Sequence, residues 1–235
     1  MIRAMIETSL IDWDGKLTTV LFFDKCNFMC PFCQNWELIL HPDKHRVIDW
    51  PEIEKKLTAK LGWIDGVVLT GGEPLVYADE VAEIASRIKG LGFLVKLDTN
   101  GAYPDKLQSL IKQKLLDYVA MDIKAPLDEE YSVAAGKRVS IKKIEGSIDI
   151  LLKDNDIAYE FRTTCVPGLI DERAIKEIGR RIKGAEKWFL QQYVPKNAYK
   201  AEYRRLPRLT EKEIEKLLRA AGDYVANVKW RGQMT

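Results

Sequence analysis

Short β-rich runs alternate with amphipathic segments along the whole chain. Several of the runs are continuously apolar, which is typical of parallel strands covered by helices on both faces. They predict strands at Leu17–Phe23, Gly66–Thr70, Phe93–Leu97, Tyr118–Ile123, Ile157–Thr164 and Lys187–Tyr193, and one more across residues 223–230.

Between the strands, apolar residues recur at helical spacing. This pattern predicts helices at Pro51–Leu61, Ala78–Lys89, Pro104–Lys114, Ser140–Lys153, Glu172–Ile182 and Thr210–Ala221. Asp49 is a suitable cap for the first helix because Pro51 follows it in the first turn. Thr210 and Glu213 form the pattern of a capping box.

Alternating strands and helices imply a parallel sheet with right-handed crossovers. Six units are too few to close an eight-stranded barrel, so the predicted fold class is α/β, a partial (β/α)6 TIM-like barrel with parallel strands. With 235 residues and 46% hydrophobic content, the chain is expected to form one domain over residues 1–235. Its core is expected at about residues 16–195, with a C-terminal helix and strand at 207–232.

Composition and charge point to neither a nucleic-acid nor a membrane partner. Thirty-seven Lys and Arg residues against 35 Asp and Glu give a net charge of +2, which demands neither a nucleic acid nor a membrane. No apolar stretch is long enough to span a bilayer, and Glu7 interrupts the apolar stretch that a signal peptide would need. Four cysteines do not form a disulfide framework, so a reducing, cytoplasmic location is expected.

Three of the four cysteines, Cys26, Cys30 and Cys33, lie in one short loop directly after the first predicted strand. Thiolates are soft ligands that suit an iron–sulfur cluster or zinc. Structural zinc prefers four protein ligands, whereas a cluster held by three cysteines leaves one iron open for chemistry. A zinc site or a non-catalytic iron–sulfur module for protein interaction remains an alternative.

The other candidate ligands fit a metal site less well. Cys165 is distant in the sequence and is expected to be a small buried hydrophobic residue. His41 and His45 are four residues apart, but Pro42 between them favours a loop.

Polar side chains follow consecutive predicted strands, where the loops of a β/α fold converge. Burying such groups is costly unless they meet partners or a ligand. The paired glycines would let the backbone approach that ligand, and the Glu73 carboxylate would suit a cationic amine. These strand-end residues are Gly71, Gly72, Glu73 and Pro74, then Asp98 and Asn100, then Asp122 and Lys124, and finally Arg162.

The CxxxCxxC spacing, with Phe32 just before the last cysteine, resembles the signature of the radical S-adenosylmethionine (radical SAM) superfamily. The resemblance implies that Cys26, Cys30 and Cys33 hold a [4Fe–4S] cluster. It also implies that the amino and carboxylate groups of S-adenosylmethionine chelate the fourth iron.

Finer motifs resemble the glycyl radical enzyme activases of that superfamily. Residues 71–74 look like the motif that binds the cofactor's amino group, and residues 98–101 and 122–124 are similar to two activase segments. The resemblance places Phe32 near the adenine and lets Asp98 and Asp122 help hold a monovalent cation. Together with the strand-end pattern, it gives these candidate cofactor contacts: Phe32, Gln34, Gly71, Gly72, Glu73, Pro74, Asp98, Asn100, Asp122, Lys124 and Arg162.

The resemblance covers roughly residues 7–195. Residues 9–16 look like the opening of activases for anaerobic ribonucleotide reductase and pyruvate formate-lyase. The chain departs from the pattern at three positions: Asp14 replaces a proline, Gln34 replaces a common histidine, and Val194 stands about where pyruvate formate-lyase activases have a cofactor-contacting histidine. The last departure weakens a specific pyruvate formate-lyase assignment.

The expected function is therefore that of a radical SAM activase. A 5′-deoxyadenosyl radical would take a hydrogen atom from a glycine of a partner enzyme, with anaerobic ribonucleotide reductase as the candidate. A low-potential donor such as ferredoxin or flavodoxin would supply the electron. The alternative within the same chemistry is a small-molecule enzyme resembling 7-carboxy-7-deazaguanine synthase, whose first cysteine gap is usually longer.

Overall fold

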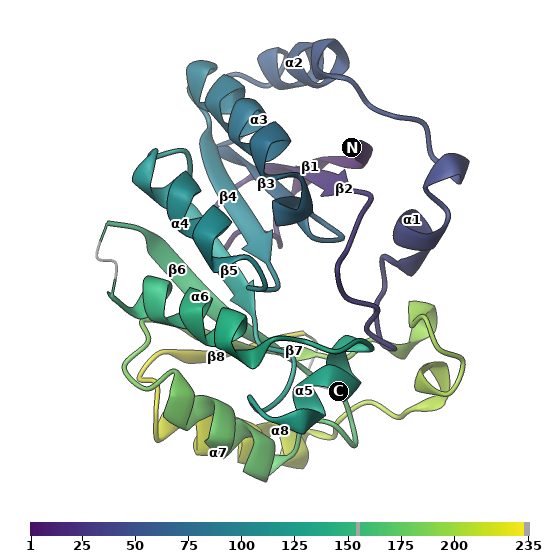
Figure 1. Cartoon of the computed structure of the whole chain (residues 1–235), viewed down its shortest axis with the longest axis vertical. Coiled ribbons are helices and arrows are strands. Elements are labelled where there is room, and N and C mark those ends of the chain that lie inside the picture. Colours follow the sequence, from purple (N-terminus) through teal and green to yellow (C-terminus); the bar gives the residue numbers. More distant parts are fainter. Residues whose placement is uncertain (154–155, 233–235) are drawn as a thin grey trace. The chain divides into compact units, whose positions relative to one another are not determined.

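Strands and helices alternate along the chain as the sequence predicts (Figure 1). The computed structural model describes residues 1–153 and 156–232. Eight strands follow one another in chain order, β1 to β8. The chain forms two compact units. The first comprises residues 1–27, 35–99 and 105–119, and the second comprises residues 28–34, 100–104 and the described residues from 120 onward.

The first unit contains β1 (Ile2–Ser9), β2 (Thr18–Phe23), β3 (Gly66–Gly71) and β4 (Leu94–Thr99). Its helices are α1 (Trp36–Leu40), α2 (Trp50–Thr58), α3 (Ala78–Gly90) and α4 (Pro104–Lys112), with short 3-10 helices η1 (Pro42–Lys44) and η2 (Pro74–Tyr77). Strand β2 pairs in parallel with β3, and β3 pairs in parallel with β4.

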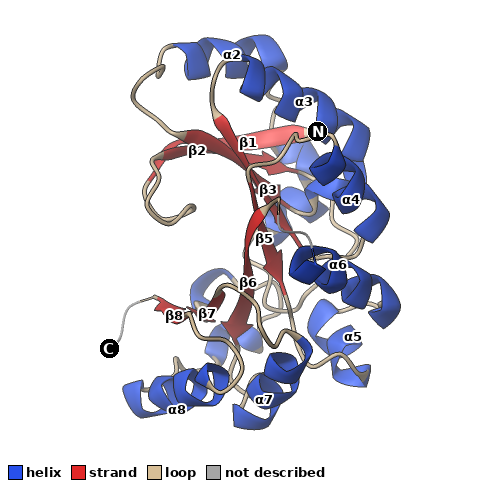
Figure 2. Cartoon of the chain, turned by 90° about the vertical axis from the view of Figure 1, so that its left-hand side faces the viewer, coloured by secondary structure: helices blue, strands red, loops and turns tan. Residues whose placement is uncertain are grey.

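The second unit contains most of β5 (Tyr118–Asp122), then β6 (Ala158–Cys165), β7 (Trp188–Gln192) and β8 (Val228–Arg231). Its helices are α5 (Glu129–Ala135), α6 (Ile141–Lys153), α7 (Glu172–Arg181) and α8 (Glu211–Gly222), with η3 (Pro195–Asn197) and η4 (Tyr203–Arg205). Strands β6, β7 and β8 are parallel, and helices α6, α7 and α8 lie on one side of them (Figure 2).

The six predicted helices and the predicted strands are confirmed, with their ends shifted by a few residues. The capping residues predicted at two helix starts are also confirmed. The Asp49 side chain accepts a hydrogen bond from the Glu52 backbone at the start of α2, and Thr210 with Glu213 forms the capping box of α8. These local patterns therefore sufficed to locate the regular elements.

Strand β1 and the short helices α1 and α5 were not predicted. Strand β1 is antiparallel to β2, with irregular register at two points. Its residues are buried only at the two ends, so the sequence lacks the clear alternation of a half-buried strand. An otherwise parallel sheet thus begins with an antiparallel edge strand, as in many mixed α/β sheets.

The parallel strands form the core of the first unit. Val20, Leu21, Val67, Val68 and Leu69 are fully buried, as the continuous apolar runs predicted. Trp13, from the loop between β1 and β2, packs with Val20, Val68 and Tyr118 on one face of these strands. The core therefore includes a loop side chain that no periodicity identified.

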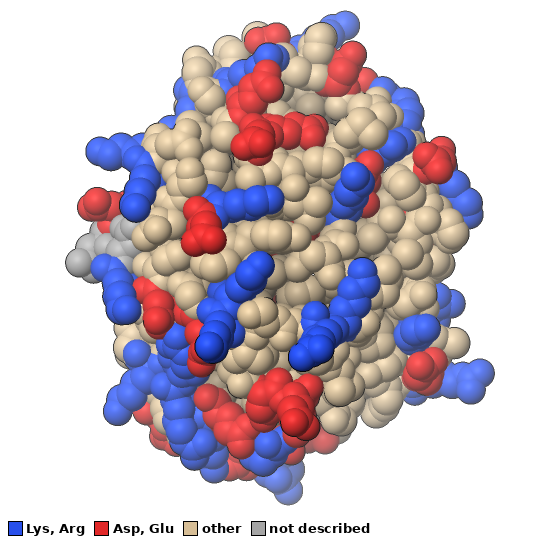
Figure 3. Space-filling model, in the orientation of Figure 1, with Lys and Arg blue, Asp and Glu red and all other residues tan. Residues whose placement is uncertain are grey.

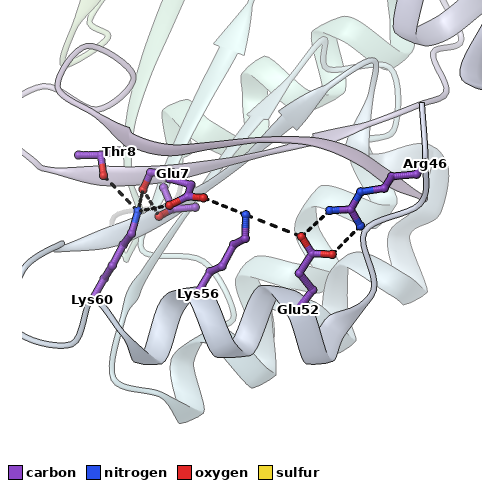
Figure 4. A network of polar contacts seen from close by, with 7 residues as sticks. Glu7, Thr8, Arg46, Glu52, Lys56 and Lys60 are labelled. Atoms are coloured by element: carbon purple, nitrogen blue, oxygen red, sulfur yellow. Dashed lines mark hydrogen bonds and ion pairs between the residues drawn. The ribbon is translucent and has the colours of Figure 1, made fainter. Parts of the chain in front are cut away.

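Hydrogen bonds and ion pairs connect strand β1 with helix α2 and with residues beside that helix (Figure 4). Lys60 donates to the backbone oxygen of Glu7, and Lys56 lies 2.8 Å from the Glu7 carboxylate. Glu52 links Lys56 to Arg46 through ion pairs of 3.7 and 2.6 Å. Occupying the polar groups of an edge strand discourages pairing with another chain.

On the face shown in Figure 3, cationic and anionic side chains are interspersed. None of the helices in residues 1–153 and 156–232 combines the length and hydrophobicity needed to cross a bilayer.

Candidate active site

The cysteine loop begins directly after β2. Cys26 belongs to the first unit, and Cys30 and Cys33 belong to the second. Cys30 is buried, and the other two are partly exposed. No disulfide joins any of the four cysteines of the described chain, Cys165 included.

Asp24 fixes the chain just before Cys26, a role that the sequence did not reveal. Its carboxylate accepts hydrogen bonds from the N-terminal amine at 3.0 Å, Arg3 Nε at 2.8 Å and the Tyr77 hydroxyl at 2.6 Å. Burial opposes ionisation of Asp24, but these bonds lower its pKa overall. The start of the cysteine loop is thereby held by a charged anchor.

The part of the loop in the second unit is held through its backbone. The Met29 amide donates to the Ala135 carbonyl at 2.8 Å, at the end of α5. The next residue, Gly136, has a φ of +64°, and a Cβ there would overlap the Met29 carbonyl. Gly136 thus permits an approach that a side chain would block, although the sequence marks it only as an ordinary helix end.

The segment after β7 contacts the loop from a distant part of the sequence. The Lys200 amide donates to the Pro31 carbonyl at 2.9 Å, and the Phe32 and Tyr203 ring centroids lie 6.4 Å apart. Gln34 Nε2 donates to the Val194 carbonyl at 2.9 Å. Residues 194–206, called here the strap, therefore position both predicted cofactor contacts of this loop.

Two glycines join the loop after β3 to the chain before Cys26. A Cβ on Gly71 would overlap the Phe23 backbone, and one on Gly72 would overlap the Lys25 carbonyl. The Gly72 amide donates to Phe23 O at 2.8 Å, and the Glu73 amide donates to Lys25 O at 2.6 Å. The glycines therefore let the loop after β3 pack against the backbone before Cys26, while the predicted approach of a ligand to them stays a prediction.

The Glu73 carboxylate is fully buried. Its Oε1 accepts hydrogen bonds from the Thr99 hydroxyl at 2.9 Å and from the Leu75 amide at 3.0 Å. Asn35 Nδ2 donates to the neighbouring Gly71 carbonyl at 3.0 Å. Glu73 thus connects β3, η2 and the end of β4 in addition to any ligand that it binds.

Asp98 lies near the end of β4, beside an unexpected buried cation. Lys96 is fully buried, and its ammonium group lies 3.5 Å from Asp98 and donates to the backbone oxygen of Asp12. It also lies 5.6 Å from the centre of the Tyr118 ring. A buried charge requires such partners, so Lys96 stabilises the polar end of this strand.

Asp122, Lys124 and Arg162 form one cluster in the second unit. Asp122 lies 2.8 Å from Lys124 Nζ and 2.7 Å from Arg162 Nε. Burial opposes ionisation of Asp122, but the two cations hold its pKa well below its usual range. Burial likewise opposes the charge of Lys124, yet Asp122 raises its pKa. The cluster therefore presents fixed charges of both signs.

The remaining predicted positions have local roles in the structure. Asn100 Oδ1 accepts a hydrogen bond from the Ala102 amide at 3.1 Å, which shapes the turn after β4. Cys165 is fully buried, and burial raises its pKa, as expected for a structural thiol. His41 and His45 flank η1 in a loop, as Pro42 suggested.

The donor chemistry of the cysteine loop fits an iron–sulfur cluster. Three thiols occur within one short loop of the sequence. Burial raises the pKa of the Cys30 thiol to about 12, and the charge of Lys124 opposes this effect. Within the described residues no three His, Cys, Asp or Glu side chains form a preformed metal cage. The assignment therefore rests on ligand type and spacing.

Comparison with known proteins places these features in a family. The model of the radical SAM superfamily matches residues 20–179, well over half of the chain. A Methanocaldococcus jannaschii protein, provisionally named a glycyl-radical enzyme activating enzyme, is 37% identical over 97% of this chain and 94% of its own length.

Other relatives share parts of the chain. The pyruvate formate-lyase-activating enzyme of Clostridium pasteurianum is 27% identical over 82% of this chain and 81% of its own length. A 7-carboxy-7-deazaguanine synthase of Methanospirillum hungatei is 34% identical over 50% of this chain and 46% of its own. A domain of a Bacteroides vulgatus pyruvate-formate lyase-activating enzyme has the same fold, with a TM-score of 0.58 at 19% identity, covering 71% of this chain and 99% of that domain.

Proposed function

The chain belongs to the radical SAM superfamily, and on that premise we propose that it activates a glycyl radical enzyme. In this chemistry one electron from a reduced [4Fe–4S] cluster splits S-adenosylmethionine into methionine and a 5′-deoxyadenosyl radical, which takes a hydrogen atom from a partner's glycine. Anaerobic ribonucleotide reductase is the candidate partner, and ferredoxin or flavodoxin is the candidate electron donor.

One observation carries this proposal: the similarity to a relative named as an activating enzyme extends over 97% of the chain. The similarity to a 7-carboxy-7-deazaguanine synthase covers only half of it. We therefore prefer the activase function, and synthesis of 7-carboxy-7-deazaguanine is the alternative function to test.

The proposed roles follow from the chemistry of each group. Cys26, Cys30 and Cys33 would ligate the cluster. The loop of residues 71–74 would bind the cofactor's amino group, and Phe32 would lie against its adenine. The fixed charges of Asp122, Lys124 and Arg162 match a zwitterionic sulfonium ligand, because they need no reorganisation when it binds. Asp98 and Asp122 would help hold a monovalent cation, while Gln34 and Asn100 complete the contacts.

We propose a cytoplasmic location. A chain with four cysteines, three of them at ligand spacing, suits a reducing compartment better than a disulfide framework would. Such a location also keeps a low-potential electron donor within reach.

The test is anaerobic reconstitution with iron and sulfide, followed by strong reduction in the presence of S-adenosylmethionine. The wild type is expected to bind about four iron atoms per chain and to release 5′-deoxyadenosine. Cys26→Ala, Cys30→Ala and Cys33→Ala should each abolish release, whereas the matched variant Cys165→Ala should retain it.

A glycyl radical signal on the partner, detected by electron paramagnetic resonance, would support the activase. Release of 5′-deoxyadenosine without any partner radical, together with production of 7-carboxy-7-deazaguanine, would favour the alternative enzyme. No release at all would contradict both.

A further inference from the structure

The hydroxyl of Tyr131 is a buried polar group that the folded chain does not satisfy. Tyr131 belongs to α5, and its side chain is fully buried. Its hydroxyl forms no hydrogen bond within residues 1–153 and 156–232. Burying a hydroxyl without a partner is costly, and a buried tyrosine normally finds one. The Tyr131 hydroxyl therefore calls for an acceptor that the chain itself does not supply.

The polar groups around this hydroxyl leave its proton available. Burial raises the pKa of Tyr131, and the charge and the backbone amide of Lys124 oppose this effect. An ammonium group and an amide N–H are donors, so neither can accept the phenolic proton. Asp122 also acts on Tyr131, but its carboxylate oxygens accept hydrogen bonds from Lys124 and Arg162 instead. Tyr131 thus keeps its proton and can donate it to an acceptor.

Helix α5 holds Tyr131 against the cysteine loop, within the second unit. The Phe28 ring meets the Tyr131 ring edge-on, with the centroids 6.4 Å apart. One turn further along the helix, the Ala135 carbonyl accepts a hydrogen bond of 2.8 Å from the Met29 amide. Residues 28 and 29 are therefore fixed on the helix that carries Tyr131, directly before Cys30.

Cys30 shares this buried environment. It is the one buried thiol among the three candidate ligands. The charge of Cys30 is among the influences that raise the pKa of Tyr131. Because electrostatic effects between single groups weaken with distance, this influence agrees with the ring and backbone contacts that bring the two residues together. The available proton of Tyr131 therefore lies on the side of α5 that faces the candidate cluster ligands.

We propose that the Tyr131 hydroxyl donates a hydrogen bond to a sulfur of the iron–sulfur cluster, either the Cys30 thiolate or a cluster sulfide next to it. This inference rests on the proposed function, because it requires the cluster that Cys26, Cys30 and Cys33 would hold. Hydrogen bonds to the sulfurs help set the reduction potential of a cluster. The reduced cluster carries one more negative charge, so the bond stabilises it and makes one-electron reduction easier.

The test compares two variants that each remove one buried hydroxyl. Tyr131→Phe keeps the ring that packs against Phe28. Tyr159→Phe is the matched control, because Tyr159 is also buried in the second unit and its ring meets Phe161 edge-on at 5.4 Å. The Tyr159 hydroxyl, however, accepts a hydrogen bond of 3.3 Å from the Glu186 amide. The measurements are urea unfolding of the apoproteins and redox titration of the reconstituted proteins, followed by electron paramagnetic resonance.

The two variants should behave in opposite ways. In the apoprotein, Tyr159→Phe should lower the urea midpoint because the Glu186 amide loses its acceptor, whereas Tyr131→Phe should not lower it. In the reconstituted protein, Tyr131→Phe should reduce the equilibrium constant for cluster reduction about tenfold, which is a shift of about 59 mV toward lower potential. Tyr159→Phe should leave the potential unchanged.

Resonance Raman spectra in light and heavy water distinguish the two possible acceptors. A solvent-isotope shift of the terminal iron–thiolate stretch that disappears in Tyr131→Phe would identify the Cys30 thiolate. The same behaviour in a bridging iron–sulfide stretch would identify the cluster sulfide. A wild-type potential in Tyr131→Phe would overturn the proposal, and so would an equal loss of apoprotein stability in both variants.

Iron content and cofactor cleavage separate this proposal from the proposed function. If the wild type releases 5′-deoxyadenosine while Tyr131→Phe keeps the wild-type potential, only the Tyr131 proposal fails. If the cluster assembles and Tyr131→Phe shifts its potential, but no 5′-deoxyadenosine is released, only the proposed function fails. A wild type that binds no cluster would contradict both.

Discussion

At the scale of single residues, two glycines determine how closely other segments approach the cysteine loop. Gly72, in the first unit, lies against the Lys25 carbonyl, and Gly136, in the second, lies against the Met29 carbonyl. Neither position has room for a Cβ. The sequence pointed to Gly72 through its turn motif, but only the structure revealed that Gly136 serves the same purpose.

Replacing Gly136 by Ala tests this role. Gly184 is a matched control, because it also has a positive φ of +87° but has no atom near its missing Cβ. Gly184→Ala should lower the free energy of unfolding by about 1 kcal/mol through backbone strain. Gly136→Ala should lower it by a further ~2 kcal/mol, because the clash moves the loop.

The measurements are urea unfolding of both variants and their iron content after reconstitution. Gly136→Ala is expected to bind less iron than Gly184→Ala. If the two variants lose equal stability and bind equal iron, the glycine does not hold the loop.

At the scale of elements, strand β1 depends on charges supplied by Lys56 of helix α2 and by Lys60, which lies two residues beyond the end of that helix. The hydrogen bonds from Lys56 and Lys60 lower the pKa of Glu7. An acid whose pKa is lower in the folded state stabilises the fold above its unfolded pKa, about 4.3 for Glu, and the gain is lost as pH falls through the folded value.

The variant Glu7→Gln should therefore have a lower thermal midpoint than the wild type near pH 7. The difference should shrink between about pH 5 and pH 3, and it should also shrink at about 1 M salt because exposed ion pairs are screened. Glu54→Gln removes a charge from an exposed position of α2 and serves as the control. A difference that is constant with pH would show that the Glu7 charge does not stabilise this edge.

At the scale of the whole molecule, cluster binding is expected to stabilise the fold. A metal centre that binds only the folded chain adds its binding free energy to folding. The reconstituted wild type should thus unfold at a higher temperature than the apoprotein. A variant with Cys26, Cys30 and Cys33 all changed to Ala should show no such shift.

Cys165→Ala separates ligation from packing in the same experiment. Its side chain is fully buried, with Sγ 3.7 Å from the Thr163 carbonyl. The variant should keep its iron and its thermal shift on reconstitution, while losing about 1–2 kcal/mol of stability through the cavity. Loss of iron by this variant would mean that Cys165 takes part in the site.

The sequence alone determined the alternation of strands and helices, the helix starts, the spacing of the cysteines and the family. These depend on residues close together in the chain, where periodicity, capping and ligand spacing act directly. The single-domain organisation stays a prediction, and so do the roles of the candidate site residues.

Only the tertiary structure decided which distant residues meet. Gln34 donates a hydrogen bond to the Val194 carbonyl, and Arg162 forms an ion pair with Asp122. Arg231 packs over the Phe189 ring and forms an ion pair with Glu160. Strand β1 and the close packing of Gly136 against the Met29 carbonyl were likewise found only in the structure. Such contacts depend on register and chain crossing rather than local pattern, because side chains far apart in sequence are brought together only when whole elements pack.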